Sequence, residues 1–207
     1  MIKFQRTYVF NTENALRGMR NPLNSWDKAD SYYDESGNYI IGPKDLELAQ
    51  KLIRGGSEHR KFMRQIFVTV DITAPLYWWK EFDTYKVGTV ANSCSTMHKI
   101  HSKEITRDDF SCDRMSDAAL KALDNLLVFI EERRKEFVES KDRKSWDDII
   151  QLLPSSYMQM RTVTLNYENI ISMIKQRSAH KLPEWSAGFI AWTENLPYSK
   201  ELLFIEK

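Results

Sequence analysis

The sequence contains few of the residues that mark several large classes of protein. Only two of its 207 residues are cysteines, Cys94 and Cys112, which is too few for a framework of disulfides. Only seven are glycines and none forms a phosphate-binding loop, so a phosphorylated ligand would have to be held by side chains. The apolar runs are broken by charge before they reach the about 20 residues that cross a bilayer. Because the N-terminus also has no basic-then-apolar segment, we expect a cytoplasmic protein without a membrane helix.

Net charge and catalytic motifs are also sparse. Lys and Arg number 30 against 29 for Asp and Glu, so no global charge draws the chain to nucleic acid or to an acidic membrane. The four histidines lack the spacing of a metal site, and no G-x-S-x-G motif supports a serine hydrolase. Cys94 lies in a polar run where an activated thiolate is conceivable, but a buried and inert thiol is the commoner case. We therefore expect no metal, nucleic-acid or membrane partner.

The regular patterns predict a mixed chain in which helices dominate. Residues 44–56 fit a helix that ends at Gly55-Gly56, and residues 65–72 alternate like a half-buried strand. Ala74-Pro75 then opens a new element, with Pro75 suited to a first helical turn. The stretch 21–43 is rich in turn residues, and further amphipathic helices are expected over 116–140, 145–153, 165–180 and 183–196. The length suits one domain over residues 1–207 of the α+β class.

The helices and strands predicted above leave one polar segment unassigned. Residues 84–98, TYKVGTVANSCSTMH, fit a strand or loop that carries small hydroxyl groups, one thiol, one amide and a single early cation, Lys86. Isolated Asn and Ser residues such as Asn92 and Ser95 are most often turn or helix-cap residues. The preceding aromatic residues, Trp78 and Trp79, are expected in the core or in a subunit interface.

Two longer stretches resemble a known family. GSEHRKFMRQIFVTVDITAPLYWWKEFDTYK resembles the region of flavin-dependent thymidylate synthases in which a glycine-ended helix, a histidine and a Phe/Val-rich strand lead into Ala-Pro and an aromatic helix. The family continues with the signature RHRxxSxNxxSxRY, for which this chain has TYKVGTVANSCSTMH. Asn92 and Ser95 keep the Asn-x-x-Ser spacing. Only Lys86 retains a charge of the basic triplet, and Met97 replaces an arginine.

The resemblance continues toward the C-terminus. LLPSSYMQMRTVTLNYENIISMIKQRSAH is similar to the family segment in which Leu-Pro precedes an Asn-bearing helix that ends in a functional arginine. Asn166 and Arg177 stand at those two positions, while Ile150 replaces an arginine. The similarity runs in outline from Asp45 to Trp192 and implies the family's fold, in which helices pack on a small, mostly antiparallel sheet.

The resemblance also implies a function and a set of site residues. Its members hold FAD at the junction of subunits of a homotetramer and methylate dUMP to dTMP, with NADPH and methylene-tetrahydrofolate as co-substrates. The flavin supplies the hydride, and the protein supplies position and charge. Cofactor-binding roles are implied for His59, Lys86, Asn92 and Asn166, with Arg64 as an added cation; catalytic or nucleotide-binding roles are implied for Ser95 and Arg177.

Several alternatives stay open. His59 is also explained as an exposed turn residue, and Arg177 as a cation that complements a helix dipole. At least three family arginines are missing, and each charge-assisted hydrogen bond is worth about 1.5–3 kcal/mol. Arg60, Lys61 and Arg64 are nearby cations that would compensate. The chain is therefore a divergent thymidylate synthase, an inactive homologue that binds a flavin or nucleotide or serves as an interaction protein, or an unrelated helical protein.

Overall fold

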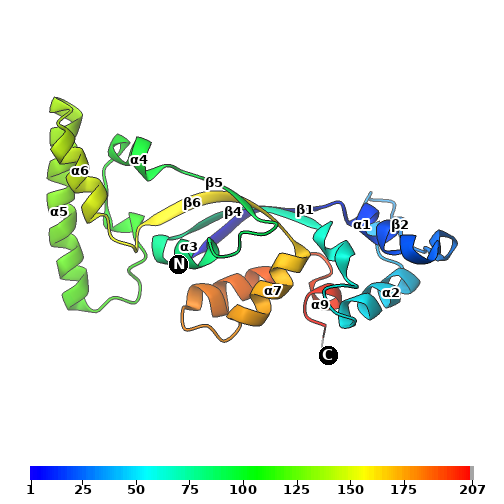
Figure 1. Ribbon diagram of the computed structural model, residues 1–207. Coiled ribbons are helices and arrows are strands. Elements are labelled where there is room, and N and C mark those ends of the chain that lie inside the picture. The colour runs from blue at the N-terminus through cyan, green and yellow to red at the C-terminus, as the bar shows by residue number, and fades with distance from the viewer. Residues whose placement is uncertain (206–207) are drawn as a thin grey trace. The chain divides into compact units, whose positions relative to one another are not determined.

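The computed structural model describes residues 1–205 (Figure 1). The chain forms two compact units. The first unit contains Met1–Lys3, Ile72–Thr84 and Asn92–Thr162. The second contains Phe4–Asp71, Tyr85–Ala91 and the chain from Val163 onward. The expectation of a single domain over residues 1–207 stays a prediction.

The strands form two sheets. In chain order they are β1 (Lys3–Phe10), β2 (Tyr32–Tyr33), β3 (Tyr39–Ile40), β4 (Phe67–Pro75), β5 (Val90–Ser93) and β6 (Met158–Asn166). Four of them make a small antiparallel sheet in the order β1-β4-β6-β5. β2 and β3 form a separate antiparallel hairpin in which Tyr32 faces Ile40 and Tyr33 faces Tyr39. Together with the helices, this sheet confirms the predicted α+β class.

β4 shows why this sequence forms a strand. Val68, Val70 and Ile72 alternate with half-buried Thr69 and its neighbours, and β-branched side chains favour extended backbone. The strand starts two residues later than predicted and continues to Pro75. Pro75 has extended backbone angles (φ −68°, ψ 152°) and caps α3 (Leu76–Phe82), so the helix begins one residue after the proline that we expected in its first turn.

Two strands of the sheet were not predicted. β1 lies in the N-terminal stretch, for which no element was predicted from the sequence, and it is largely exposed. β6 occupies residues that precede the predicted helix 165–180. That helix, α7 (Tyr167–Arg177), begins two residues later than expected because Asn166 ends the strand and caps the helix.

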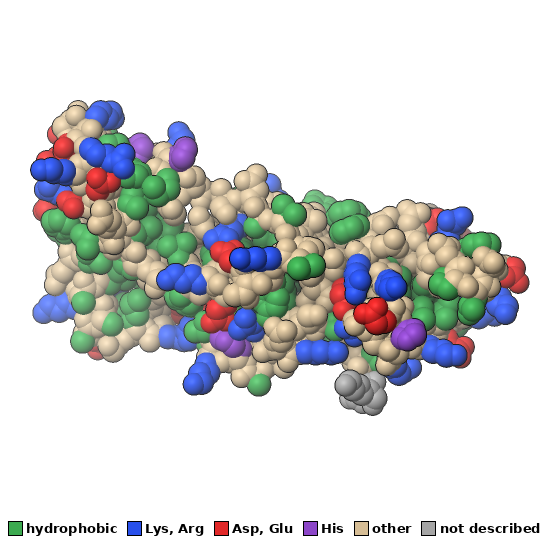
Figure 2. Space-filling view, in the orientation of Figure 1, with side chains coloured by type: hydrophobic (Ala, Val, Ile, Leu, Met, Phe, Trp, Pro, Cys, Tyr) green, Lys and Arg blue, Asp and Glu red, His purple; other side chains and the backbone are tan. Residues whose placement is uncertain are grey.

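The first unit contains a helical pair with its own core. Its helices are α3, α4 (Thr96–Lys99), α5 (Asp117–Ser140) and α6 (Arg143–Leu152). α5 and α6 lie side by side, and hydrophobic side chains gather over them on the surface (Figure 2). The core of this pair consists of Ile100, Ile105, Phe110, Leu123, Leu127, Ile130 and Ile149. Both helices confirm the sequence prediction, and Trp78 and Trp79 are core residues, 0% and 1% exposed.

The second unit contains the remaining helices. They are α1 (Thr12–Met19), α2 (Pro43–Arg54), α7, a π-helix (Glu184–Phe189), α8 (Ile190–Glu194) and α9 (Ser199–Leu202). α1 was not predicted, whereas α2 and α7 were. The core includes Tyr167, Trp185 and Phe189. The Tyr167 hydroxyl donates to the Pro197 carbonyl at 2.6 Å, and burial raises the pKa of Tyr167.

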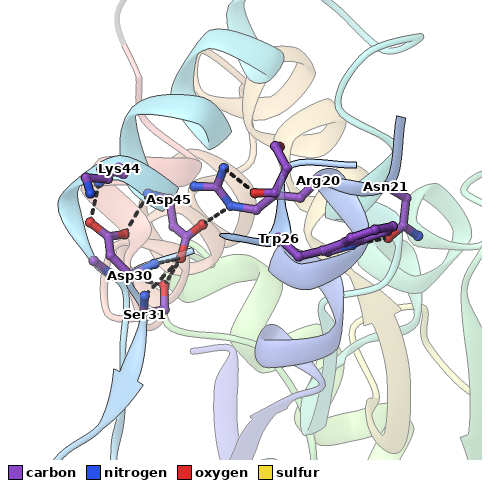
Figure 3. Close-up of polar contacts among 9 residues, drawn as sticks. Arg20, Asn21, Trp26, Asp30, Ser31, Lys44 and Asp45 are labelled. Carbon is purple, nitrogen blue, oxygen red and sulfur yellow. Dashed lines mark hydrogen bonds and ion pairs between the residues drawn. The ribbon is translucent and has the colours of Figure 1, made fainter. Parts of the chain in front are cut away.

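A buried ion pair organises the turn-rich stretch before α2 (Figure 3). The Asp45 carboxylate accepts hydrogen bonds from Arg20 Nε at 2.6 Å and from the backbone N–H and hydroxyl of Ser31 at 2.9 and 2.6 Å. In return, the Asp30 carboxylate accepts from the backbone N–H groups of Lys44 and Asp45 in the first turn of α2. Gly42 permits this approach, because a Cβ there would collide with the backbone carbonyl of Asp30. The loop therefore caps α2 with a side chain that is distant in sequence.

Over residues 1–205, no helix combines the length and apolar character that crossing a membrane requires.

Candidate functional site

α7 of the second unit carries two of the predicted site residues at its ends. Asn166 is its N-cap: the side-chain oxygen accepts from the backbone N–H of Asn169 at 3.0 Å, and the Asn169 side chain accepts from the N–H of Asn166 at 3.1 Å. This reciprocal pair satisfies helix donors that would otherwise be unpaired. The Asn166 side chain is buried, so its oxygen is committed to the fold.

Arg177 lies in the last turn of α7 between two aromatic rings. Its Nε donates to the Tyr85 hydroxyl at 2.7 Å, and its guanidinium carbon is 5.4 Å from the Tyr85 ring centre and 4.9 Å from that of Trp185. The Tyr85 hydroxyl in turn donates to Gln176 Oε1 at 2.9 Å. A planar guanidinium suits this arrangement, because it stacks on aromatic faces while its edge forms hydrogen bonds. Sequence reasoning missed Tyr85 and Trp185.

The loop at residues 85–89 packs against both ends of α7. At the N-terminal end, Asn169 Nδ2 donates to the Val87 carbonyl at 2.7 Å. Gly88 lies directly on the capping pair with φ +76°, and a Cβ there would be 2.9 Å from Asn166 Nδ2. Lys86 lies between these contacts with an exposed side chain. The loop thus covers the Asn166 amide, and it carries one exposed cation, Lys86.

Replacing Gly88 by alanine is expected to destabilise this arrangement by about 1–3 kcal/mol, because L residues disfavour positive φ and the new methyl group overlaps Asn166. Urea unfolding monitored by fluorescence checks the prediction. Gly37→Ala is the matched control, since φ is +79° there but a Cβ meets no atom within 4 Å. An equal cost for both substitutions would show that the overlap at Asn166 contributes nothing.

The segment that follows α2 lies on the first turn of α7. Arg60 makes a bidentate ion pair with Glu168, with Nε and Nη2 donating at 2.7 and 2.9 Å, and both side chains are largely buried. Arg60 is therefore committed to Glu168, and our expectation that it replaces a missing arginine is not supported by this geometry. Lys61 and Arg64 are exposed, and Arg64 donates to the Ser57 carbonyl at 3.4 Å.

His59 lies in the turn of this segment with an exposed side chain. Its ring lies against Gly55, where a Cβ would be 3.2 Å from the ring carbons. Five of the predicted site residues therefore lie in the second unit: His59, Arg64, Lys86, Asn166 and Arg177. They belong to three segments, namely the segment after α2, the 85–89 loop and α7 itself, and the first two contact α7. Within residues 1–205, no hydrogen bond links the side chains of His59, Arg64 or Lys86 to Asn166 or Arg177.

Asn92 and Ser95 lie in the first unit. Asn92 is an exposed residue of β5, and the pairing with β6 continues through Cys94, whose N–H donates to the Met160 carbonyl at 2.9 Å. Ser95 caps α4, accepting from the N–H groups of Met97 and His98 at 3.2 and 3.1 Å. The helix-cap interpretation of Ser95 therefore describes its role in the fold. Cys94 is exposed, so the expectation of a buried thiol is wrong.

A cavity of about 210 Å³ adjoins Ser95 in the first unit. Lys99 and Lys103 line it together with Tyr157. Lys103 is paired with Asp109, and this hydrogen bond raises the pKa of Lys103, while burial raises the pKa of Tyr157. Sequence reasoning missed both lysines, although Ser95 and Lys99 are four residues apart in a short helical stretch and so share a face.

No group of three or more His, Cys, Asp or Glu side chains in residues 1–205 has the arrangement of a metal site.

Comparisons with known proteins find a match in fold but none in sequence. No family model matches the sequence, and no curated protein matches it. The fold, however, is similar to a crystal structure of thymidylate synthase X (ThyX) from Helicobacter pylori with FAD and dUMP, with a TM-score of 0.68 over 98% of this chain and 96% of that chain at 16% identity. A second structure, of flavin-dependent thymidylate synthase ThyX from Helicobacter pylori complexed with FAD and dUMP, has the same TM-score and identity and is covered to 97%. The chain therefore has the fold of these ThyX structures over nearly its whole length.

Proposed function

We propose that this protein is a divergent flavin-dependent thymidylate synthase, which methylates dUMP with FAD as cofactor and NADPH and methylene-tetrahydrofolate as co-substrates. The observation that carries the proposal is the full-length likeness in fold to two structures that contain FAD and dUMP. The five predicted residues that gather around α7 support it.

The donor set of the second unit fits a flavin. His59 offers an exposed imidazole that would contact the isoalloxazine ring, whereas Asn166, which is buried beneath Gly88, would act by holding the 85–89 loop in place. Lys86 and Arg64 are exposed cations that would meet the pyrophosphate. FAD, when bound, supplies hydride transfer, and these residues supply its orientation and charge balance.

The nucleotide would be held by other residues. Arg177, oriented by Tyr85 and Trp185, would direct its positive charge to the pyrimidine or to its phosphate. The first unit offers a set of its own at the cavity of Ser95, where Lys99 would supply a cation close in sequence to the position where Met97 replaces an arginine; Asn92 keeps the cofactor-binding role that the resemblance implies. This set has fewer charges than the family signature, so we expect weaker phosphate binding than in its relatives.

The test is the visible spectrum of the purified protein, with and without added FAD, followed by tritium release from labelled dUMP in the presence of NADPH and methylene-tetrahydrofolate. We expect a yellow protein and detectable release. A protein that remains colourless and inert in excess FAD would refute the proposal. Lys99→Met should weaken dUMP binding, whereas Lys121→Met, on an exposed face of α5, should not.

A second candidate is a homologue that binds flavin or nucleotide without turnover. One observation favours it: Tyr85, which falls within the stretch of the family's basic triplet, is hydrogen-bonded to Arg177 and Gln176. Thermal stabilisation by FAD or dUMP without tritium release would support this function. Growth of a thymidine-requiring strain that expresses the chain would exclude it.

We also expect a homotetramer. β1 carries the aromatic residue Tyr8, 66% exposed in the single chain, and exposed aromatic surface of this kind is typical of subunit interfaces. Light scattering checks the oligomeric state, and a monomer at all concentrations would contradict the expectation.

A further inference from the structure

The largest cavity described in the second unit lies apart from all the residues discussed for FAD and dUMP. It has a volume of about 630 Å³ and lies between the end of β1, the first turn of α1, the β2–β3 hairpin and Tyr198. A volume of this size is within the range of small-ligand sites, roughly 300–1,000 Å³. None of the residues proposed above for flavin or nucleotide binding lines it.

Aromatic rings form much of its wall. Tyr33 and Tyr39 meet edge to face with ring centres 5.2 Å apart, and Phe10, 47% exposed, stacks on Phe67. Tyr198 completes the wall, with its hydroxyl accepting from the Ile41 N–H at 2.9 Å and donating to the Tyr39 carbonyl at 3.2 Å. Such rings offer flat apolar faces to a planar ligand.

The cavity carries one charged side chain, the carboxylate of Glu13. The Tyr33 hydroxyl donates to Glu13 Oε2 at 2.8 Å, and this hydrogen bond raises the pKa of Tyr33, so the phenol stays neutral. Burial likewise raises the pKa of Tyr39. No Lys, Arg or His is among the described residues that line the cavity. Its electrostatics therefore disfavour anions and favour groups that donate hydrogen bonds.

The hydrogen bonds within the wall leave several side-chain acceptors without a protein donor in the described part of the chain. Asn14 Nδ2 donates to Asn11 Oδ1 at 2.8 Å, and Asn38 Nδ2 donates to Asp34 Oδ2 at 3.1 Å. Within residues 1–205, the side-chain oxygens of Asn14 and Asn38 and Oε1 of Glu13 receive no hydrogen bond. These exposed oxygens can accept from the N–H groups of a ligand, and Glu13 Oε1 is the charged one among them.

Backbone strain concentrates at the same place. Asn11 and Tyr198 line the cavity and have φ values of +68° and +53°. A tyrosine in the left-handed region is uncommon, and such conformations persist where surrounding contacts hold them. The two hydrogen bonds of the Tyr198 hydroxyl provide that hold, so this wall is fixed before a ligand arrives.

We propose that this cavity binds a planar group with a pair of amidine-type N–H donors, as found in amidinium and guanidinium ions and in the 2-aminopyrimidinone edge of guanine. The paired N–H groups meet the Glu13 carboxylate, and the flat body lies against the tyrosine rings. The site adds a binding function beyond the proposed reaction, because it shares no residue with the groups assigned to FAD or dUMP.

The test uses two matched pairs of probes, benzamidine against benzamide and guanosine against inosine, measured by calorimetry and by ¹H–¹⁵N NMR of the full chain. Benzamidine binding that exceeds benzamide binding supports a cationic ligand, and guanosine binding that exceeds inosine binding supports a neutral ring, since inosine lacks only the 2-amino group. Glu13→Gln should weaken the preferred probe about tenfold or more, because charge-assisted hydrogen bonds are the strong ones. Glu47→Gln, an exposed carboxylate of α2 outside the cavity, should leave binding unchanged.

Tyr33→Phe gives a second, opposite expectation. It frees Glu13 Oε2 while keeping the ring, so it should maintain or strengthen binding, whereas Tyr33→Ala should weaken it. The proposal is overturned if no probe shifts the resonances of the lining residues, if both members of each pair bind equally, or if Glu13→Gln matches the wild type. None of these readouts uses FAD or dUMP, so a failure here and a failure of the proposed function are separate results.

Discussion

Replacing Asp45 by alanine is expected to lower the free energy of unfolding by about 3–5 kcal/mol, the usual cost of removing one partner of a buried ion pair. Asp45 and Arg20 are only 2% and 4% exposed, and Arg20 Nε lies 2.6 Å from the Asp45 carboxylate. The substitution leaves the Arg20 guanidinium buried without its counter-ion and deprives Ser31 of the acceptor for its N–H and hydroxyl. The loop that caps α2 would then lose its anchor.

Urea unfolding followed by tryptophan fluorescence measures this effect. Asp27→Ala is the matched control, because Asp27 is exposed, and its cost should stay within about 0.5 kcal/mol. A loss for Asp45→Ala no larger than the control's would show that the buried pair does not stabilise the second unit.

The same pair predicts how the stability depends on pH. Burial acts to raise the pKa of Asp45, but hydrogen bonds from Ser31, Arg20 and the backbone outweigh it, so the pKa lies below its usual value. A carboxylate with a lowered pKa in the folded state stabilises the protein above the unfolded pKa of about 3.9, and this stability is lost as the pH falls through the folded value. The difference in stability between wild type and Asp45→Ala should therefore be full at neutral pH and shrink in acid.

Arg177→Lys is expected to weaken dUMP binding about tenfold to a hundredfold, although it preserves the positive charge. The guanidinium is held by the Tyr85 hydroxyl and by the faces of Tyr85 and Trp185, and an ammonium group cannot reproduce both contacts. Isothermal calorimetry with dUMP measures the change. This expectation depends on the proposed function.

Lys175→Gln provides the control, because Lys175 lies in the same final turn of α7 with an exposed side chain. This variant should retain wild-type affinity for dUMP if Arg177 binds through its oriented guanidinium group and not only through the positive charge of the last turn of α7. Equal losses in both variants, or none in Arg177→Lys, would leave only the helix-dipole role for Arg177.

The local sequence pattern was sufficient to predict the long amphipathic elements. α5 and α6 were predicted because their apolar residues recur at helical spacing, and β4 because its β-branched residues alternate. β1 and β6 were missed because a strand becomes stable only when its partners satisfy its backbone groups, and those partners lie far away in sequence. α1 was missed although Asn11 is a favoured N-cap residue type and Glu13 is an acidic residue in the first turn; the helix has only 8 residues, too few for a sustained apolar period.

For the candidate site, the sequence identified residue types and spacing but not how each side chain is used. The sequence alone was enough to recognise the Asn-x-x-Ser spacing of Asn92 and Ser95 and the Asn and Arg residues of α7. The burial of Arg60 against Glu168 and the stacking of Arg177 on Tyr85 cannot be recognised in this way. These pairings join residues up to 108 positions apart, a separation over which local spacing carries no information.

By itself, the sequence determined the balance of helix and strand, the near-zero net charge and the loss of the signature arginines, because each depends only on residue type and short-range periodicity. Tertiary structure decided which cations remain available to a ligand and which are neutralised, which amides serve as caps, and where an aromatic cavity with a single carboxylate forms. Burial, hydrogen bonding and ion pairing arise only when distant segments meet, so the same arginine is a ligand in one fold and a structural counter-ion in another.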